Sequence, residues 1–345
     1  MSIRVYKWHE MAYCGIVRNM GRFGSALTVF VLCTGILSCT GGKGAEELGA
    51  SQKTLDAAFQ KISTVVKEPK KGRLIVHFIT PTSIASKESW TYLDKMEPEL
   101  EKQNFRTVYI CSPEYEFLKI GNELSRQVGE LKPKNPVVFD MDYTIWAAFG
   151  AIKYSYTSLV VDGEIKNSSR EFLGKSTLEK LLGNNFRNIS KTASEIPFTP
   201  SRIVKCGYLD GRIGNCKGTE IERVYEFTDP RSYTEFTPYL EGKWYFGPEM
   251  AWHSDDETGR LSISFAGKEV YMFAKSQSDR SFPVQVWIDG LLPDKSYYGS
   301  DMKQGRVMIS DGKIYNIFKN MPSTSHTMTI ETQSKDCAIF SLEFR

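Results

Sequence analysis

The most reactive side chains in this 345-residue sequence are its seven cysteines. Cys206 and Cys216 enclose a loop that holds three glycines and an Asp-Gly pair, a composition typical of turns. A disulfide across so short a loop would stabilise the fold by roughly 2–3 kcal/mol. We expect a structural disulfide here, while a redox-active pair and two free thiols remain alternatives. No Cys-x-x-Cys motif, the usual redox arrangement, occurs in the chain.

Other catalytic chemistry has little support. The chain holds four histidines, which is little material for a histidine-rich metal site, and no Gly-x-Ser-x-Gly elbow of a serine hydrolase. Its 44 basic and 41 acidic residues leave a net charge of +3, so no charge excess points to nucleic acid. We therefore predict no metal, no cofactor and no nucleic-acid partner.

The N-terminal segment is typical of a secretion signal. Residues 26–37 form an apolar run of about 12 residues, which suits a signal sequence and is short for a bilayer span. The following ILSC at residues 36–39 resembles a bacterial lipobox, in which Cys39 would be lipidated. We predict a lipoprotein signal peptide over residues 1–39, with Met20 as an alternative start, and a flexible tether over residues 40–51. The mature chain would then be anchored to a membrane on the extracytoplasmic side of the cell envelope; the alternative is a buried helix with an incidental cysteine.

A first globular region is expected over residues 52–183. Apolar runs alternate with amphipathic segments, a pattern that favours an α/β layer architecture. Strands are expected at 74–79, 105–111, 135–140 and 158–165, and helical segments at 55–62, 86–100, 116–128, 146–149 and 177–182.

Three segments of this region resemble thioredoxin-like proteins. FITPTSIAS at residues 78–86 is similar to the family's strand-to-helix corner, with Ser83 and Ser86 at the two cysteine positions. VYICSPEYEF at 108–117 and NPVVFDMDY at 135–143 resemble two later family segments. Together they resemble the extracytoplasmic thioredoxin-like domain that ends DipZ-type cytochrome c biogenesis proteins. The resemblance implies a thioredoxin fold.

The departures from this family pattern concern its redox site. A thioredoxin needs a thiolate at a helix N-terminus, and the hydroxyl pKa of Ser83 or Ser86 is far too high to replace it. The family also places a cis-proline opposite the site, whereas residues 152–157 contain no proline. We predict a redox-silent domain without catalytic residues. Cys111 is expected to be a buried structural cysteine rather than a lone reactive thiol.

The remainder of the chain is rich in short β-strand patterns. A polar linker is predicted over residues 184–201, followed by an all-β, jelly-roll-like sandwich over residues 202–345. Trp244 and Trp287 are expected in its core. In order, the segments at residues 242–244, 286–290, 299–301, 314–315 and 326–330 resemble the carbohydrate-binding-module-like domain of DipZ-type proteins. The expected strands are 240–246, 260–265, 269–274, 284–290, 313–318, 326–331 and 338–344.

Exposed aromatic residues beside acidic ones are candidates for sugar binding, because sugar rings stack on aromatic faces while polar groups bind hydroxyls. Trp252 lies near Asp255 and Asp256, and Tyr297 and Tyr298 lie in a polar loop. The acidic loop could hold Ca²⁺, but a solvated loop is favoured.

Two function classes follow. The favoured one is a non-enzymatic, lipid-anchored protein whose sandwich binds a polysaccharide or an envelope protein. The alternative is a thiol–disulfide oxidoreductase of the thioredoxin (redoxin) family that uses cysteines outside the usual corner.

Overall fold

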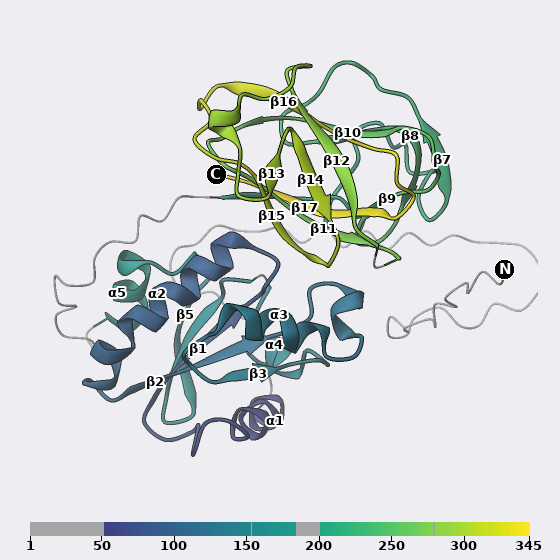
Figure 1. Ribbon diagram of the computed structural model, residues 1–345. Helices are drawn as coiled ribbons and strands as arrows, with labels where there is room; N and C mark the ends of the chain where they lie inside the picture. Colours follow the sequence, from purple (N-terminus) through teal and green to yellow (C-terminus); the bar gives the residue numbers. More distant parts are fainter. Residues whose placement is uncertain (1–51, 153, 184–200, 279) are drawn as a thin grey trace, which may run out of the picture. The chain divides into compact units, whose positions relative to one another are not determined.

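The computed structural model describes residues 52–152, 154–183, 201–278 and 280–345 (Figure 1). These residues belong to one compact unit. The predicted signal peptide with Cys39, the tether and nearly all of the linker lie outside the described residues. Within the described part of the chain, none of the helices has the length and apolar character that a membrane crossing requires.

The first domain has a thioredoxin-like α/β fold. Its five strands lie in the order β3-β2-β1-β4-β5, with β1 parallel to β2 and antiparallel to β4. The fold expected for this region is therefore confirmed. Its helices and strands are α1 (Gln52–Ile62), β1 (Arg73–Ile79), α2 (Ile84–Glu101), β2 (Phe105–Cys111), the 3-10 helix η1 (Glu116–Lys119), α3 (Glu123–Leu131), β3 (Val137–Phe139), α4 (Thr144–Ala148), β4 (Thr157–Val161), β5 (Glu164–Ser169) and α5 (Lys175–Leu182).

Strand β1 is central because it is buried on both faces, as its continuous apolar run predicts. Leu74, Val76 and Phe78 pack with α1 and α4 on one face. Ile75 and Ile79 pack with α2, α3 and α5 on the other. Figure 1 shows α2 and α1 on opposite sides of the sheet.

One helix of this domain differs from its prediction. We expected a continuous helix over residues 116–128, but the structure has the short η1 and then α3. Gly121, with φ +57°, lies between them in a backbone conformation that an α-helix does not use. The prediction was wrong here because the apolar spacing continues across the break.

The second domain is an antiparallel β-sandwich formed by one sheet that folds over its own core. Strand β8 belongs to both layers: Pro238–Glu241 pair with β10, and Gly242–Tyr245 pair with β7. Gly242 has φ +87°, and a Cβ atom there would lie 2.9 Å from the Thr258 carbonyl oxygen. Only glycine fits this corner without strain.

All seven strands predicted for the sandwich are present, and five shorter ones were not predicted. The predicted strands correspond to β8 (Pro238–Phe246), β10 (Gly259–Ala266), β11 (Val270–Ser276), β12 (Phe282–Ile288), β15 (Lys313–Phe318), β16 (Ser325–Thr332) and β17 (Cys337–Phe344). The additional strands are β6 (Arg202–Lys205), β7 (Val224–Phe227), β9 (Ala251–His253), β13 (Met302–Lys303) and β14 (Arg306–Ile309).

Candidate functional site

The two serines at the thioredoxin-like corner both accept hydrogen bonds from backbone N–H groups. Ser83 is the N-cap of α2, and its Oγ accepts a hydrogen bond from the Ser86 backbone N–H at 3.3 Å. Ser86 Oγ in turn accepts from the Thr80 backbone N–H at 2.9 Å. Both side chains are buried. This arrangement satisfies the backbone N–H groups of Ser86, in the first turn of α2, and of Thr80, which follows β1.

The helix N-terminus itself is occupied by a carboxylate of the second domain. Glu343 on β17 accepts from the Ile84 N–H through Oε2 at 2.9 Å and from the Ala85 N–H through Oε1 at 3.0 Å. Its exposed fraction is 5%. The first N–H groups of a helix lack partners within the helix and favour a negative charge. In a thioredoxin the same feature lowers the pKa of the nucleophilic thiol, whereas here it binds Glu343.

A second contact joins α2 to the end of the chain. The Arg345 guanidinium meets Glu88 through two N–O contacts of 2.8 Å each. Arg345 also lies 3.4 Å from Glu269. A bidentate arginine–carboxylate pair fixes orientation as well as distance. This pair therefore fixes the residue that follows β17 against α2.

A half-buried ion pair lies beside the corner. Lys205 on β6 pairs with Glu114 and donates to the Tyr115 hydroxyl at 3.0 Å. Glu114 also accepts from Thr80 at 3.0 Å and from Thr82. Burial works to lower the pKa of Lys205, but the charges of Glu114 and Tyr115 outweigh it and raise the pKa. The lysine is therefore firmly charged and acts as a structural cation.

Further contacts complete what we call the corner interface, defined by Glu343, Arg345, Lys205 and Glu249 against the thioredoxin-like domain. Both oxygens of Glu249 accept from the Glu116 backbone N–H at 3.0 Å. Burial raises the pKa of Glu249 to about 7. The Tyr115 ring also packs on aromatic residues of the second domain, with centroid distances of 5.3 Å to Phe273 and 4.8 Å to Phe340.

The expected disulfide between Cys206 and Cys216 is not present: the structure contains both as free thiols. Cys206 follows β6 and is buried in the sandwich core. Cys216 is half-buried, and its Sγ donates to Glu220 Oε2 at 3.6 Å. Both thiols contact the sandwich core, but only that of Cys216 is partly exposed and hydrogen-bonded to a carboxylate.

The remaining described cysteines are buried. Burial raises the pKa of Cys206 and of Cys337 to about 12, and it raises the pKa of Cys111 well above its ordinary value. A thiol must ionise to act as a nucleophile. These three cysteines are therefore suited to packing rather than to exchange chemistry.

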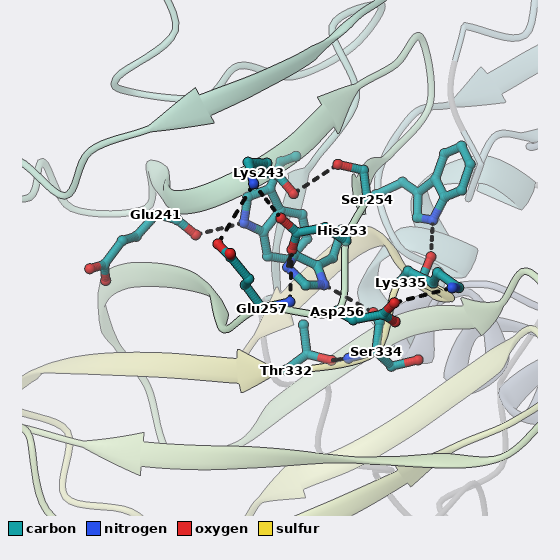
Figure 2. A network of polar contacts seen from close by, with 12 residues as sticks. Glu241, Lys243, His253, Ser254, Asp256, Glu257, Thr332, Ser334 and Lys335 are labelled. Carbon is teal, nitrogen blue, oxygen red and sulfur yellow. Dashed lines mark hydrogen bonds and ion pairs between the residues drawn. The ribbon is translucent and has the colours of Figure 1, made fainter.

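Figure 2 shows the polar network that contains Asp256, one of the predicted ligand-binding residues. Trp252 is half-buried, and its indole N–H donates to the Lys335 carbonyl at 2.6 Å. Asp255 lies 3.0 Å from Lys243 and 3.3 Å from the buried His253. Partial burial by itself would raise the pKa of Asp255. The hydrogen bond from Lys243, together with weaker contacts, outweighs this effect, so the pKa is lowered.

The carboxylates of the acidic loop at residues 255–257 form ion pairs with lysines. Asp256 contacts Lys335 at 3.2 Å, and Glu257 lies 3.6 Å from Lys243. Within the described residues, no cluster of three or more metal-ligating side chains is found. The structure thus places these carboxylates in ion pairs on the surface of the sandwich.

The two predicted tyrosines lie elsewhere in the sandwich. Tyr297 ends the 3-10 helix η3 (Lys295–Tyr297), and Tyr298 follows it. Both are partly buried against the sandwich core. The backbone of Tyr298 forms an isolated antiparallel β-bridge with Phe318. Of the five predicted ligand-binding residues, Asp256 alone lines a surface groove on the sandwich.

This groove of about 740 Å³ is formed mainly by residues that the sequence did not indicate as ligand-binding. Trp287 was expected in the core, but it is half-exposed and lines the groove, whereas Trp244 is buried. The reason is strand alternation: Val284 and Val286 on β12 point into the core, so Trp287 faces outward. That alternation was present in the sequence and could have identified the residue.

Comparison with known proteins gives a family match for the second part of the chain. Residues 210–344 match a family model described as "Thioredoxin like C-terminal domain". No curated protein matches the chain. This match covers less than half of the chain.

Several solved structures are similar to parts of this chain. StoA from Bacillus subtilis is 16% identical, with a TM-score of 0.28 over 33% of this chain and 84% of that one. A secreted disulfide oxidoreductase of Mycobacterium tuberculosis is 14% identical, with a TM-score of 0.26 over 32% and 80%. An active-site mutant of a family two carbohydrate esterase from Clostridium thermocellum is 13% identical, with a TM-score of 0.25 over 31% of each chain.

Proposed function

We propose that this protein is a non-enzymatic binding protein of the cell envelope. Its thioredoxin-like domain is redox-silent and supports a β-sandwich that recognises a glycan or a protein partner. The observation that carries the proposal is Glu343, whose carboxylate is bound by the Ile84 and Ala85 N–H groups at the start of α2. A domain with serines at this corner and a carboxylate on its helix N-terminus has no group there that could exchange with a disulfide.

The alternative, an oxidoreductase that uses other cysteines, has less support. The buried thiols of Cys111, Cys206 and Cys337 all have raised pKa values. Cys216 is more accessible, but its own pKa is also raised, first by partial burial. None of the described cysteines lies at a helix N-terminus, where thiol pKa values are lowered.

Insulin reduction tests the redox-silent state. We expect the full chain in detergent to precipitate insulin with dithiothreitol no faster than dithiothreitol alone, with a thioredoxin as positive control. Acceleration by the unmodified chain, lost in a variant with all four described cysteines changed to alanine, would refute the proposal.

Restored cysteines test the role of Glu343 itself. We expect Ser83→Cys/Ser86→Cys to remain slow, because Glu343 still fills the helix N-terminus. Adding Glu343→Ala is expected to raise the rate at least about tenfold, because removal of the side chain frees the Ile84 and Ala85 N–H groups for the thiolate. Equal rates in the double and triple variants would show that Glu343 does not block this position.

We also propose that Cys39 is lipidated and anchors the chain on the extracytoplasmic side of the membrane. The supporting observations are the apolar run at residues 26–37, the lipobox-like ILSC and the likeness to DipZ-type proteins. Cys39→Ala should move the protein from the membrane fraction to the soluble fraction and abolish palmitate labelling. Unchanged labelling in this variant would contradict the anchor.

A further inference from the structure

The groove on the sandwich lies on an outer sheet face that is polar along one row of strands. Arg306 on β14 is opposite Gln285 on β12, and Gln285 is opposite Glu331 on β16. The row continues from Glu331 to Arg260 on β10 and to Glu241 on β8. Residues directly opposite each other in a sheet point to the same face. Five neighbouring strands therefore present a line of polar side chains toward solvent.

This row is ordered by its own contacts. Arg306 Nε donates to Gln285 Oε1 at 3.1 Å, and Gln285 Nε2 donates to the Gly305 carbonyl at 2.7 Å. Arg260 Nε donates to Glu331 Oε2 at 2.8 Å, and its Nη1 donates to Glu241 at 3.1 Å. Side chains held in this way lose little further entropy when a ligand binds.

Trp287 adds an aromatic platform beside the row. It lies two residues beyond Gln285 on β12, opposite Thr329, so it shares the same face. Its indole Nε1 is buried without a hydrogen-bond partner among the described residues. Such an unsatisfied group costs free energy in a core and calls for an explanation. A ligand oxygen that reached this N–H would satisfy it.

The charges that line the groove are largely neutralised. Asp256 pairs with Lys335 at 3.2 Å, and Asp336 pairs with Arg280 at 3.3 Å. Glu331 is held by Arg260. The lining therefore offers planar hydrogen-bonding groups and an aromatic face without a strong net charge, a combination suited to a ligand with many hydroxyl groups.

We propose that the face formed by Trp287, Gln285, Arg306 and Glu331 binds an uncharged polysaccharide. This inference rests on the proposed binding function and names its site and ligand class. A sugar ring packs on the Trp287 indole, and ring hydroxyls exchange hydrogen bonds with Gln285, Glu331 and the remaining N–H groups of Arg306.

The experiment uses the full chain in detergent and native affinity gels that contain laminarin, dextran, xylan or galactomannan, with polygalacturonate and alginate as acidic counterparts. We expect retardation by at least one uncharged polysaccharide, with little change between low and high salt. Trp287→Ala and Gln285→Ala should each weaken that binding at least about tenfold. Tyr225→Ala, an exposed aromatic residue of β7 outside the groove, is the matched control and should bind like the unmodified chain.

Arg306→Met distinguishes loss of binding from loss of folding. Because Arg306 is exposed, this substitution should weaken binding without changing the circular dichroism spectrum. Three outcomes would overturn the inference: no retardation by any uncharged polysaccharide, preference for the acidic ones with strong salt dependence, or binding that survives the groove substitutions. None of these concerns insulin reduction, so failure of this site is distinguishable from failure of the redox-silent proposal.

Discussion

The role of Glu343 can be tested through the stability of the corner interface. Glu343→Gln keeps the shape of the side chain but removes its charge and one acceptor oxygen. One of the Ile84 and Ala85 N–H groups then faces an amide NH₂ instead of a carboxylate oxygen. Leaving a buried donor unsatisfied costs about 1–3 kcal/mol.

Two further contributions set the expected size. Loss of a negative charge at a helix N-terminus costs about 0.3–1 kcal/mol. Glutamine is cheaper to bury than a carboxylate, which works in the opposite direction. We expect the free energy of unfolding to fall by about 2 kcal/mol, which is within the range of these contributions.

Urea denaturation followed by circular dichroism measures the loss, and hydrogen exchange with mass spectrometry localises it to peptides that contain residues 84–86. The matched control is Glu226→Gln, an exposed glutamate on β7, which should change stability by less than about 0.5 kcal/mol. If Glu343→Gln is as stable as the unmodified chain and exchange at the start of α2 is unchanged, the carboxylate does not hold the two domains together.

Three other predictions follow from the structure. The pKa of Glu249 is raised in the folded state to about 7, so this residue contributes stability at low pH that is lost as the pH rises from about 4.5 to 7. Glu249→Gln should therefore flatten the dependence of the free energy of unfolding on pH in this range. An unchanged slope would contradict this prediction. Native alkylation read by mass spectrometry should label Cys216 first, with the three buried cysteines slower by at least about 100-fold; equal labelling would show that they are accessible. Gly242→Ala should lower the free energy of unfolding by about 1–3 kcal/mol because of its φ of +87° and its contact with Thr258; an unchanged urea midpoint would show that the β8 corner tolerates a side chain.

The sequence was most informative where burial is continuous. Strand β2 begins and ends at the predicted residues, Phe105 and Cys111, because its apolar run is buried on nearly every position. The short strands β9 and β13 were not predicted, since two or three residues carry too little periodicity to be distinguished from a loop. Pairing with longer strands, which the sequence does not display, forms them.

Trp287 shows a different kind of failure. Tryptophan is usually highly buried, and that tendency favoured a core position. The alternation of Val284, Gln285, Val286 and Trp287 pointed the other way, and in the structure this local pattern decides the outcome. Strand periodicity is thus the better guide to the groove than residue type alone.

Glu343 could not be assigned from local pattern at all. It lies in the last strand, separated from Ile84 by nearly the whole described chain, and its partners are backbone N–H groups that any helix start presents. The sequence could show only that Ser83 and Ser86 supply no thiolate. A helix N-terminus without a thiolate still needs an acceptor for its N–H groups once it is buried. Glu343 supplies this acceptor from the second domain. The helix N-terminus that carries the redox site in thioredoxins is therefore a contact between the two domains in this protein.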